Sequence, residues 1–317
     1  MDYPILEQLE ERLGRLHAWE RLQIENEHHQ RIFGAGINFF HPENWYSFHA
    51  FIRYSLMLLG LYGRGRRNAR NIQVKNNTIS IPGLPEAFEN FTVLHISDPH
   101  VDMTVDAGDT LIRCIQDLDY DLCVLTGDYR AHTSGPFDAT LQVMEQIRSR
   151  LRDPVYGVLG NHDSIRMVPG LEAMGIRMLL NESATIERAG AVLHLSGIDD
   201  AHYYRVDNIT KAAQAVPRDG ISILLSHTPE IYRQAARAQF NVMLCGHTHG
   251  GQICLPGGFP LTLDARCPRN IGAGTWMYGD MIGYTSVGSG TSIVNARLNC
   301  PPEVTLHRLA RAQRSEP

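Results

Sequence analysis

The stretch VMLCGHTHGGQ, residues 242–252, ends an apolar run with two histidines that are one residue apart and surrounded by glycines. Glycine backbone can turn sharply and pass close to an ion or a phosphate. Two interpretations fit these eleven residues alone: a flexible loop that contains histidines, or a loop that bends around a metal ion. The rest of the chain distinguishes between them.

Five apolar runs of the chain end in residues that can bind a metal, and they span 91–97, 121–126, 155–159, 221–226 and 241–245. The residues that follow them are, in order, Asp98 with His100, Asp128, Asn161, His227, and His247 with His249. Ligand sites of open α/β sheets gather at the carboxyl ends of the strands. The five run ends therefore predict a single shared site.

These seven side chains offer carboxylate, amide and imidazole ligands and no thiolate. Such a set favours borderline to hard divalent ions such as Mn, Fe or Zn. Seven ligands are too many for one tetrahedral ion, but they suit two ions that share one carboxylate. Two ions about 3.5–4 Å apart can activate a water for in-line attack on phosphorus. We therefore expect two divalent metal ions as cofactors, with manganese preferred and iron or zinc as alternatives.

The ordered set DPH, GD, GNHD, SH and GHTH resembles the calcineurin-like metallophosphoesterase superfamily over about residues 91–250. GHTHGGQ and the ending GSGTSIVNARLNCPPEVTLHRL resemble its bacterial branch of small phosphodiesterases and phosphohydrolases, which often work at the membrane. Pro99 replaces a leucine that is common in the family, but it fixes only φ and blocks no ligand. The resemblance implies an α/β fold, a two-sheet β-sandwich with flanking helices.

The resemblance also implies a role for each residue of the site. The first metal is expected on Asp98, His100 and His249, and the second on Asn161, His227 and His247, with Asp128 bridging the two. His162 is the expected catalytic residue, facing the phosphate to stabilise developing charge or protonate the leaving oxygen. Asp163 is expected to orient His162 by accepting its other ring N–H.

The elements that must position this site follow from the hydrophobic pattern. The apolar runs alternate with helical patterns at about 105–119, 138–151, 207–216 and 229–238. This alternation predicts βαβ units and a sheet buried on both faces. The interval 176–198 predicts antiparallel strands, and the tail from about 281 predicts β-structure. NIQVKNNTISI, residues 71–81, predicts a β-hairpin that turns at Asn76 and Asn77.

The predicted organisation is an N-terminal helical region over 1–70 and a metallophosphoesterase catalytic domain over 71–317. Residues 2–33 are predicted to form one helix, with an apolar stripe made by Leu6, Leu9, Leu13 and Leu16. Packing on the same chain and pairing in a homodimer both fit this stripe.

A second helix is predicted over about 45–62, followed by the basic stretch GRGRRNAR from Gly63 to Arg70. Apolar rings and leucines followed by arginines suit a membrane interface, so we expect peripheral membrane contact through 45–70. A buried helix with a solvated basic loop is the alternative. The most apolar segment, residues 48–62, is shorter than the roughly 20 residues that span a bilayer.

Composition narrows the classes of function. The chain has 317 residues, 43% of them apolar, which suffices for one large α/β domain or two ordinary ones. Its net charge of −5 argues against a dedicated nucleic-acid binder. The six cysteines form no Cys-x-x-Cys pair, which fits reduced thiols, and the start of the chain has no signal-peptide pattern. A cytoplasmic location is predicted, peripheral at the inner face of the membrane.

The predicted function is metal-dependent hydrolysis of a phosphodiester or pyrophosphate bond by a hydroxide that bridges two metals, on a lipid-linked substrate. A soluble nucleotide phosphodiesterase, including one for cyclic nucleotides, is the main alternative. A phosphoprotein phosphatase, a nuclease and a non-catalytic scaffold are less favoured. For residues near the motifs, substrate contact and loop structure both stay open: Arg130, His132, Asp199, Asp200, His202, Arg266 and Arg269.

Overall fold

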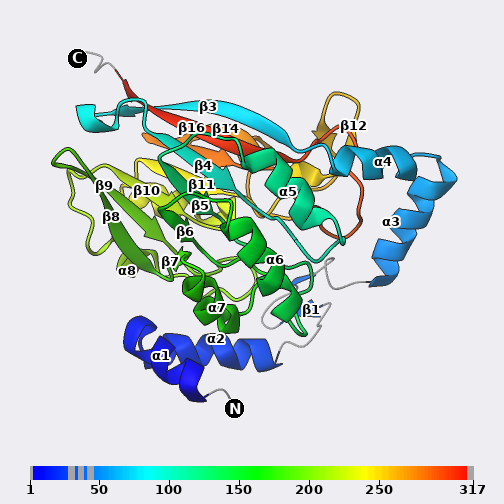
Figure 1. Cartoon of the computed structure of the whole chain (residues 1–317), viewed down its shortest axis with the longest axis horizontal. Coiled ribbons are helices and arrows are strands. Elements are labelled where there is room, and N and C mark those ends of the chain that lie inside the picture. The colour runs from blue at the N-terminus through cyan, green and yellow to red at the C-terminus, as the bar shows by residue number, and fades with distance from the viewer. Residues whose placement is uncertain (1–2, 28–32, 35–38, 41–45, 313–317) are drawn as a thin grey trace.

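Two six-stranded sheets pack face to face, and helices cover their outer faces (Figure 1). The computed structural model describes residues 3–27, 33–34, 39–40 and 46–312. The predicted α/β fold, a two-sheet sandwich with flanking helices, is confirmed.

The first sheet has the strand order β3-β16-β4-β5-β6-β7. Its members are β3 (Gln73–Pro82), β16 (Glu303–Ala312), β4 (Thr92–Ile96), β5 (Leu122–Leu125), β6 (Val155–Gly157) and β7 (Arg177–Met178). Strands β4 to β7 run parallel, so the segments that follow β4, β5 and β6 leave the sheet at one edge.

The second sheet has the strand order β14-β15-β11-β10-β9-β8. Its members are β14 (Gly274–Tyr278), β15 (Met281–Thr285), β11 (Val242–Cys245), β10 (Ser222–Leu225), β9 (Ala191–Gly197) and β8 (Glu182–Arg188). The four inner strands are parallel, and β8 pairs antiparallel with β9. This last pair confirms the antiparallel strands predicted within 176–198.

Burial on both faces explains why the central strands are unbroken apolar runs. In β5, Leu122 and Val124 face the core between the sheets, while Cys123 and Leu125 face the outer helices. Strand β11 alternates in the same way between the inner core and its own helix layer. Parallel strands covered on both sides are typically continuous in hydrophobicity. Each strand end is thereby held from two sides.

The outer helices occupy the positions that the sequence pattern indicates. On the first sheet lie α5 (Ala107–Ile115), α6 (Asp138–Arg148) and α7 (Val168–Ala173), and on the second α8 (Ile209–Ala213) and α9 (Tyr232–Arg237). Short 3-10 turns are η2 (Glu86–Phe88), η3 (Ile165–Met167), η4 (Pro229–Ile231), η5 (His249–Gly251) and η6 (Arg269–Ile271). Two short antiparallel pairs complete the elements, β1 (Phe33–Gly34) with β2 (Phe39–Phe40) and β12 (Cys254–Leu255) with β13 (Phe259–Pro260).

The hairpin predicted over 71–81 is wrong. Strand β3 continues through Asn76 and Asn77 and pairs in parallel with β16 along its whole length. The Asn77 side chain lies 3.0 Å from Nδ1 of His307, which is 230 residues later, and it accepts a 3.0 Å hydrogen bond from the Thr275 hydroxyl. A distant partner therefore outweighs the local turn preference of two asparagines, because strand pairing depends on tertiary context.

The single helix predicted over 2–33 is wrong in its extent. The chain forms α1 (Tyr3–Leu13) and α2 (Arg15–Glu27), which separate at Gly14, where φ is 86°. Leu9 and Leu13 are buried in the main core, but Leu16 is 86% exposed, because α2 starts a new helix after the break and packs through Ala18 and Leu22 instead. Residues 28–32 of the predicted helix lie outside the described residues. The homodimer stays a prediction.

The helix predicted at 45–62 is confirmed as α3 (Tyr46–Leu58), and the chain turns after it at Gly60, where φ is 68°. The basic stretch, which is a loop in the alternative interpretation, is helical and forms α4 (Tyr62–Ala69). Among the residues that the structure describes, no helix has the length and apolar character needed to cross a bilayer. The division into 1–70 and 71–317 stays a prediction.

Candidate metal centre

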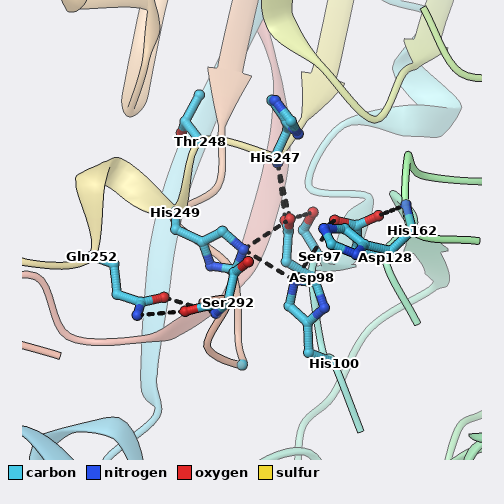
Figure 2. Close-up of polar contacts among 12 residues, drawn as sticks. Ser97, Asp98, His100, Asp128, His162, His247, Thr248, His249, Gln252 and Ser292 are labelled. Carbon is cyan, nitrogen blue, oxygen red and sulfur yellow. Dashed lines mark hydrogen bonds and ion pairs between the residues drawn. The ribbon is translucent and has the colours of Figure 1, made fainter. Parts of the chain in front are cut away.

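The seven predicted ligands meet where strand ends of both sheets converge. Figure 2 labels Asp98, His100, Asp128, His247 and His249 among them. Asp98 and His100 follow β4, Asp128 follows β5, and Asn161 follows β6. His227 follows β10, and His247 and His249 follow β11 in the second sheet. All seven side chains are buried. The His247 backbone N–H also donates to the Asp98 carboxylate at 3.1 Å, which ties the two sheets together.

Asp98, His100 and His249 form a first group of candidate ligands. Their donor atoms lie within 4.8 Å of one another. Nε2 of His100 is 3.1 Å from Nε2 of His249, which is 3.5 Å from Oδ1 of Asp98. The Nδ1–H of His100 faces the carbonyl oxygen of Arg130 at 2.8 Å. That hydrogen bond assigns the lone pair to Nε2, the arrangement that orients histidine as a metal ligand.

A second group consists of Asp128, His227 and His247, whose donor atoms also lie within 4.8 Å of one another. The amide oxygen of Asn161 joins them, 2.8 Å from Nε2 of His227 and 2.9 Å from Nδ1 of His247. His227 directs Nδ1 at the carbonyl oxygen of Thr126 at 2.8 Å. Its Nε2 therefore faces the group with a lone pair when the ring is neutral.

Asp128 contacts imidazoles of both groups. Its Oδ2 lies 3.3 Å from Nε2 of His227 and 3.6 Å from Nε2 of His100. A carboxylate in this position suits the bridging role expected for it. The ligand roles themselves stay predictions.

The donor set fits two divalent ions. Imidazole nitrogens, carboxylates and one amide oxygen converge in a buried space, which suits borderline divalent metals. Nε2 of His100 and Nε2 of His249 face each other across 3.1 Å within the first group. Two such groups joined by Asp128 match a dinuclear centre.

The backbone of the ligand loops is strained. Five of the seven predicted ligands have positive φ, namely Asp98 (50°), His100 (40°), Asp128 (57°), His247 (72°) and His249 (49°). Few non-glycine residues adopt this region, and such residues concentrate at functional sites where the surroundings hold them. The buried strands on either side provide that support, so the ligands are preorganised.

Two glycines are required here by close approach. A Cβ on Gly246 would collide with the side chains of Ser97 and Asp98, and one on Gly160 would collide with the Asp128 carboxylate. The bare backbone of GHTHGG therefore lets the second sheet press directly against a ligand of the first. Between the two ligand histidines, Thr248 turns away and donates to the Gly272 carbonyl oxygen at 2.6 Å (Figure 2).

His162 lies beside the bridging position. Its backbone N–H donates to Oδ1 of Asp128 at 2.9 Å, and its ring Nε2 is 3.9 Å from Oδ2 of the same carboxylate. Nδ1 of the ring lies 3.4 Å from the Thr133 hydroxyl. The ring is thus close enough to both groups to face a substrate held between them.

The expectation that Asp163 accepts a ring N–H of His162 is wrong. Its carboxylate instead accepts backbone N–H groups of Asp128 at 2.7 Å, Tyr129 at 2.9 Å and Gly160 at 2.8 Å. These bonds occupy both carboxylate oxygens and tie the loop after β5 to the loop after β6. Asp163 therefore positions Asp128 through the backbone.

Electrostatic coupling within the site is strong. Burial opposes protonation of His227, but the Asp128 carboxylate outweighs it and raises the pKa of His227 to about 10. Burial also opposes ionisation of Asp128, yet His227 and His162 hold the pKa of that carboxyl well below its usual range. Burial and neighbouring histidines lower the pKa of His247 and His249 well below 6.5. These two rings are neutral and can act as ligands at physiological pH.

A buried polar chain behind Asp98 was not predicted. The Ser97 hydroxyl donates to Asp98 and accepts from the Thr126 hydroxyl at 2.6 Å. Thr126 lies 2.8 Å from Nε2 of His95, whose Nδ1 is 3.3 Å from Nε2 of His307. The available signal was a polar side chain inside otherwise apolar runs, as in FTVLHIS.

Two buried arginines brace the ligand loops. Arg297, which was not predicted, donates to the carbonyl oxygens of Val287 and Gly290 at 2.7 Å and lies 3.1 Å from Nδ1 of His249. Arg130, for which substrate contact was left open, is buried and donates to backbone carbonyls of His162, Thr133 and Gly135. Both side chains therefore support the loop geometry.

The loop after β9 divides into two parts. Asp199 contacts His17 of α2 at 3.0 Å, and Asp200 accepts backbone N–H groups within its own loop. His202 differs, because its ring centre lies 4.1 Å from that of His247 and its Nδ1 is 3.2 Å from Glu230. Asp199 and Asp200 are structural, whereas His202 borders the second ligand group.

Comparison with known proteins agrees with this geometry. The family model described as calcineurin-like phosphoesterase matches residues 91–251. A relative in Bacillus subtilis, the uncharacterized metallophosphoesterase YkoQ, is 32% identical over 78% of this chain and 93% of its own length. The phosphodiesterase YaeI of Escherichia coli is 30% identical over 60% of this chain and 70% of its own length. A Bos taurus protein described as a transmembrane protein with metallophosphoesterase domain is 29% identical over 72% of this chain and 55% of its own length.

Proposed function

Because the chain belongs to the calcineurin-like phosphoesterase family, we propose that it hydrolyses a phosphodiester or pyrophosphate bond with the help of two divalent metal ions. The observation that carries the proposal is the pair of ligand groups joined by Asp128. Asp98, His100 and His249 would hold one ion, and Asn161, His227 and His247 the other. Bound ions of this kind supply Lewis-acid polarisation of the phosphate and activation of a water molecule.

The side chains of the protein hold the reacting groups in place and supply a proton. In the proposed reaction a water oxygen adds to phosphorus, the bond from phosphorus to the leaving oxygen breaks, and the leaving oxygen takes a proton. His162 lies beside Asp128 and is the group placed to give that proton or to stabilise the developing charge. Asp163 holds the loop after β5 to the loop after β6, so Asp128 and His162 keep their relative positions.

The finer proposal is that the cleaved ester belongs to a lipid-linked molecule and that manganese is the metal. Exposed apolar and basic side chains on α3 and α4 support the lipid link. The cytoplasmic location at the inner face of the membrane stays a prediction. Hydrolysis of soluble nucleotides, including cyclic ones, is the alternative, and equal turnover of a nucleotide in free solution and with vesicles present would favour it.

Turnover of a chromogenic phosphodiester with added Mn²⁺ tests the chemistry. His162→Ala should lower kcat by about 10²–10⁴-fold, the usual contribution of a positioned acid. Asp128→Asn should abolish turnover, whereas Asp117→Asn, at an exposed carboxylate of the same domain, should leave it unchanged. Turnover that survives chelation, or that is retained in Asp128→Asn, would contradict the proposal and favour a non-catalytic scaffold.

A further inference from the structure

Helix α3 buries one side and exposes apolar residues on the other. Ile52 and Leu56 pack against a small cluster that includes Val294. Leu58 is 89% exposed and Tyr54 is also exposed, and Leu59, which directly follows the helix, is 68% exposed. Single exposed apolar residues are normal, but several large ones on one short element mark an interaction surface.

The β12–β13 hairpin adds three large apolar residues that are roughly half exposed, namely Leu255, Phe259 and Leu261. Ile253, at the root of this hairpin, packs on the same cluster as Leu56 of α3. The hairpin and α3 therefore flank one patch of core, and Figure 1 shows β12 close to α4. The hairpin begins at Cys254, five residues after His249, so it follows a ligand loop closely.

The segment that contains α3 and α4 has a positive net charge, whereas the whole chain has a negative one. Residues 46–70 contain five arginines and no acidic residue, while the whole chain carries −5. Arg53, Arg64, Arg66 and Arg67 are exposed, and Arg70 pairs with Asp106 at 2.8 Å. Exposed apolar side chains beside a basic cluster are complementary to an anionic lipid surface.

A cavity of about 550 Å³ lies between α3, α4 and two loops of the domain. Arg53 and Arg66 line it together with Tyr54, Met103 and Asn295. Two guanidinium groups beside a tyrosine suit a phosphate headgroup, because arginine binds phosphate through its planar donors.

Both loop walls of the cavity connect to the metal centre. The backbone N–H of Met103 donates to the carbonyl oxygen of His100 at 2.9 Å. Gln252, the last residue of GHTHGGQ, donates to the carbonyl oxygen of Ser292 at 2.8 Å (Figure 2). It also donates to the carbonyl oxygen of Val294 at 2.7 Å. The segment before Asn295 is therefore fastened to the loop that carries His249.

Helix α4 has its own connection to the ligands. The Gly65 carbonyl oxygen accepts a 3.0 Å hydrogen bond from the backbone N–H of Arg297, and a Cβ on Gly65 would collide with Ala296. The Arg297 side chain then reaches His249. A helix held in this way keeps a fixed position relative to the metal centre.

We propose that α3, α4 and the β12–β13 hairpin form a docking face for an anionic bilayer. The face consists of Tyr54, Leu58, Leu59, Leu255, Phe259 and Leu261 together with Arg53, Arg64, Arg66 and Arg67. The cavity at Arg53 and Arg66 takes an anionic phosphate headgroup, and the docked chain presents its metal centre to lipid-linked phosphoesters. Only this last step depends on the proposed function, because docking requires no catalysis.

Vesicle sedimentation at low salt tests the docking face. The full chain should bind vesicles that contain phosphatidylglycerol and should not bind vesicles of phosphatidylcholine alone. The triple variant Arg64→Glu, Arg66→Glu, Arg67→Glu should bind roughly 100-fold more weakly, since each basic residue near an anionic surface contributes about fivefold. Leu58→Glu should weaken binding about tenfold. Arg15→Glu and Leu16→Glu on α2, equally exposed, should leave it unchanged.

A pair of matched double variants tests the cavity. Arg53→Gln with Arg66→Gln removes the same charge as Arg64→Gln with Arg67→Gln, but only the first pair lines the cavity. The first pair should lose severalfold more affinity for the anionic vesicles. Equal losses would overturn the headgroup site.

The experiments distinguish a failure of the docking face from a failure of the proposed hydrolysis. All docking-face variants should keep wild-type turnover of the soluble chromogenic phosphodiester, since none contacts the metal ligands. Absence of vesicle binding by the full chain would overturn the docking face and leave the hydrolase intact. A concentration-dependent dimer that Leu58→Glu dissociates, without vesicle binding, would assign the face to a second copy and also overturn the proposal.

Discussion

The two pairs of N-terminal helices precede the segment that matches the family model, yet they use their side chains in opposite ways. Helices α1 and α2 bury Leu9, Leu13 and the fully buried Arg21 against the two-sheet body of the chain. Helices α3 and α4 leave Leu58 and the arginines of α4 exposed. In Figure 1, α1 and α2 lie beneath α7, whereas α3 and α4 project from another side.

Helix α2 braces the loop that carries His162. Nη2 of Arg21 donates to the carbonyl oxygen of Asp163 at 2.8 Å, and its guanidinium lies 3.2 Å from the centre of the Tyr204 ring. Glu25 accepts the Ile165 backbone N–H at 2.7 Å and pairs with Arg166 at 2.8 Å. The loop after β6 is therefore held from outside the family segment.

The two pairs of helices differ in whether a carboxylate lies near each arginine, and this difference accounts for which arginine is buried. Arg21 is buried because Asp199, at 3.5 Å, and Glu25, at 3.7 Å, compensate its charge. For Arg64, Arg66 and Arg67 no ion pair to a carboxylate is found among the described residues, and they stay at the surface. Buried charges require such partners, whereas exposed ones do not.

The largest expected effect comes from removing the buried charge of α2. Arg21→Met should lower the free energy of unfolding by about 3–5 kcal/mol, because Asp199 and Glu25 lose the cation that compensates them. Urea denaturation of the full chain measures the loss. Arg15→Met, at an exposed arginine six residues earlier, should change stability by less than about 0.5 kcal/mol. Similar losses for both variants would contradict the assigned role of Arg21.

Glu25→Gln should have a smaller effect that reaches the active site. Loss of the carboxylate leaves the Ile165 N–H and Arg166 with a weaker partner, which costs about 1–3 kcal/mol. Because the affected loop carries His162, kcat for the soluble diester should fall while KM changes little. Glu25→Asp should restore part of kcat. A loss of stability with unchanged kcat would limit α2 to a structural role.

Metal affinity should depend on pH in a way that docking variants do not alter. In the metal-free protein the pKa of His227 is raised to about 10, and the ring must be neutral to bind metal. Binding therefore releases a proton, and Mn²⁺ affinity should rise about tenfold per pH unit below pH 10 from this group. The same raised pKa stabilises the metal-free fold at low pH, and that contribution is lost as the pH rises through about 10. Calorimetric titration at several pH values measures both the slope and the proton release, and a flat profile would exclude His227 as a ligand.

The smallest expected effect is the change in the free energy of unfolding when an exposed leucine of α2 or α3 is replaced. Leu58→Glu and Leu16→Glu should each change the free energy of unfolding by less than about 0.5 kcal/mol, since both side chains are almost fully in solvent. Only the first should affect vesicle binding. A destabilisation of several kcal/mol in Leu58→Glu would show that α3 is packed against something in solution.

The candidate site was largely predictable because its determinants are local. Each predicted ligand type follows an apolar run, and a run that becomes a buried parallel strand must deliver its last residue to the edge of the sheet. The positions of Asp98, Asp128, Asn161, His227 and His247 follow from that rule. The order of short strands and helices could be predicted from the sequence for the same reason.

Other features depended on contacts between distant segments. Strand β3 pairs with β16 although its asparagines favour a turn, and Asp163 uses its carboxylate on backbone N–H groups and not on His162. Which N–H groups lie near a carboxylate depends on how two loops approach, and no local pattern encodes that approach.

The sequence by itself determined the chemistry of the site, since ligand types and glycines at strand ends are written in the order of the residues. Only the tertiary structure decided that Arg21 and Arg297 are buried and that Leu58 and Arg64 are exposed. The hydrophobicity and charge of a side chain limit the environments, buried or exposed, that it can occupy. Burial depends on which surfaces of the folded chain meet, and that is settled only when all the elements pack together.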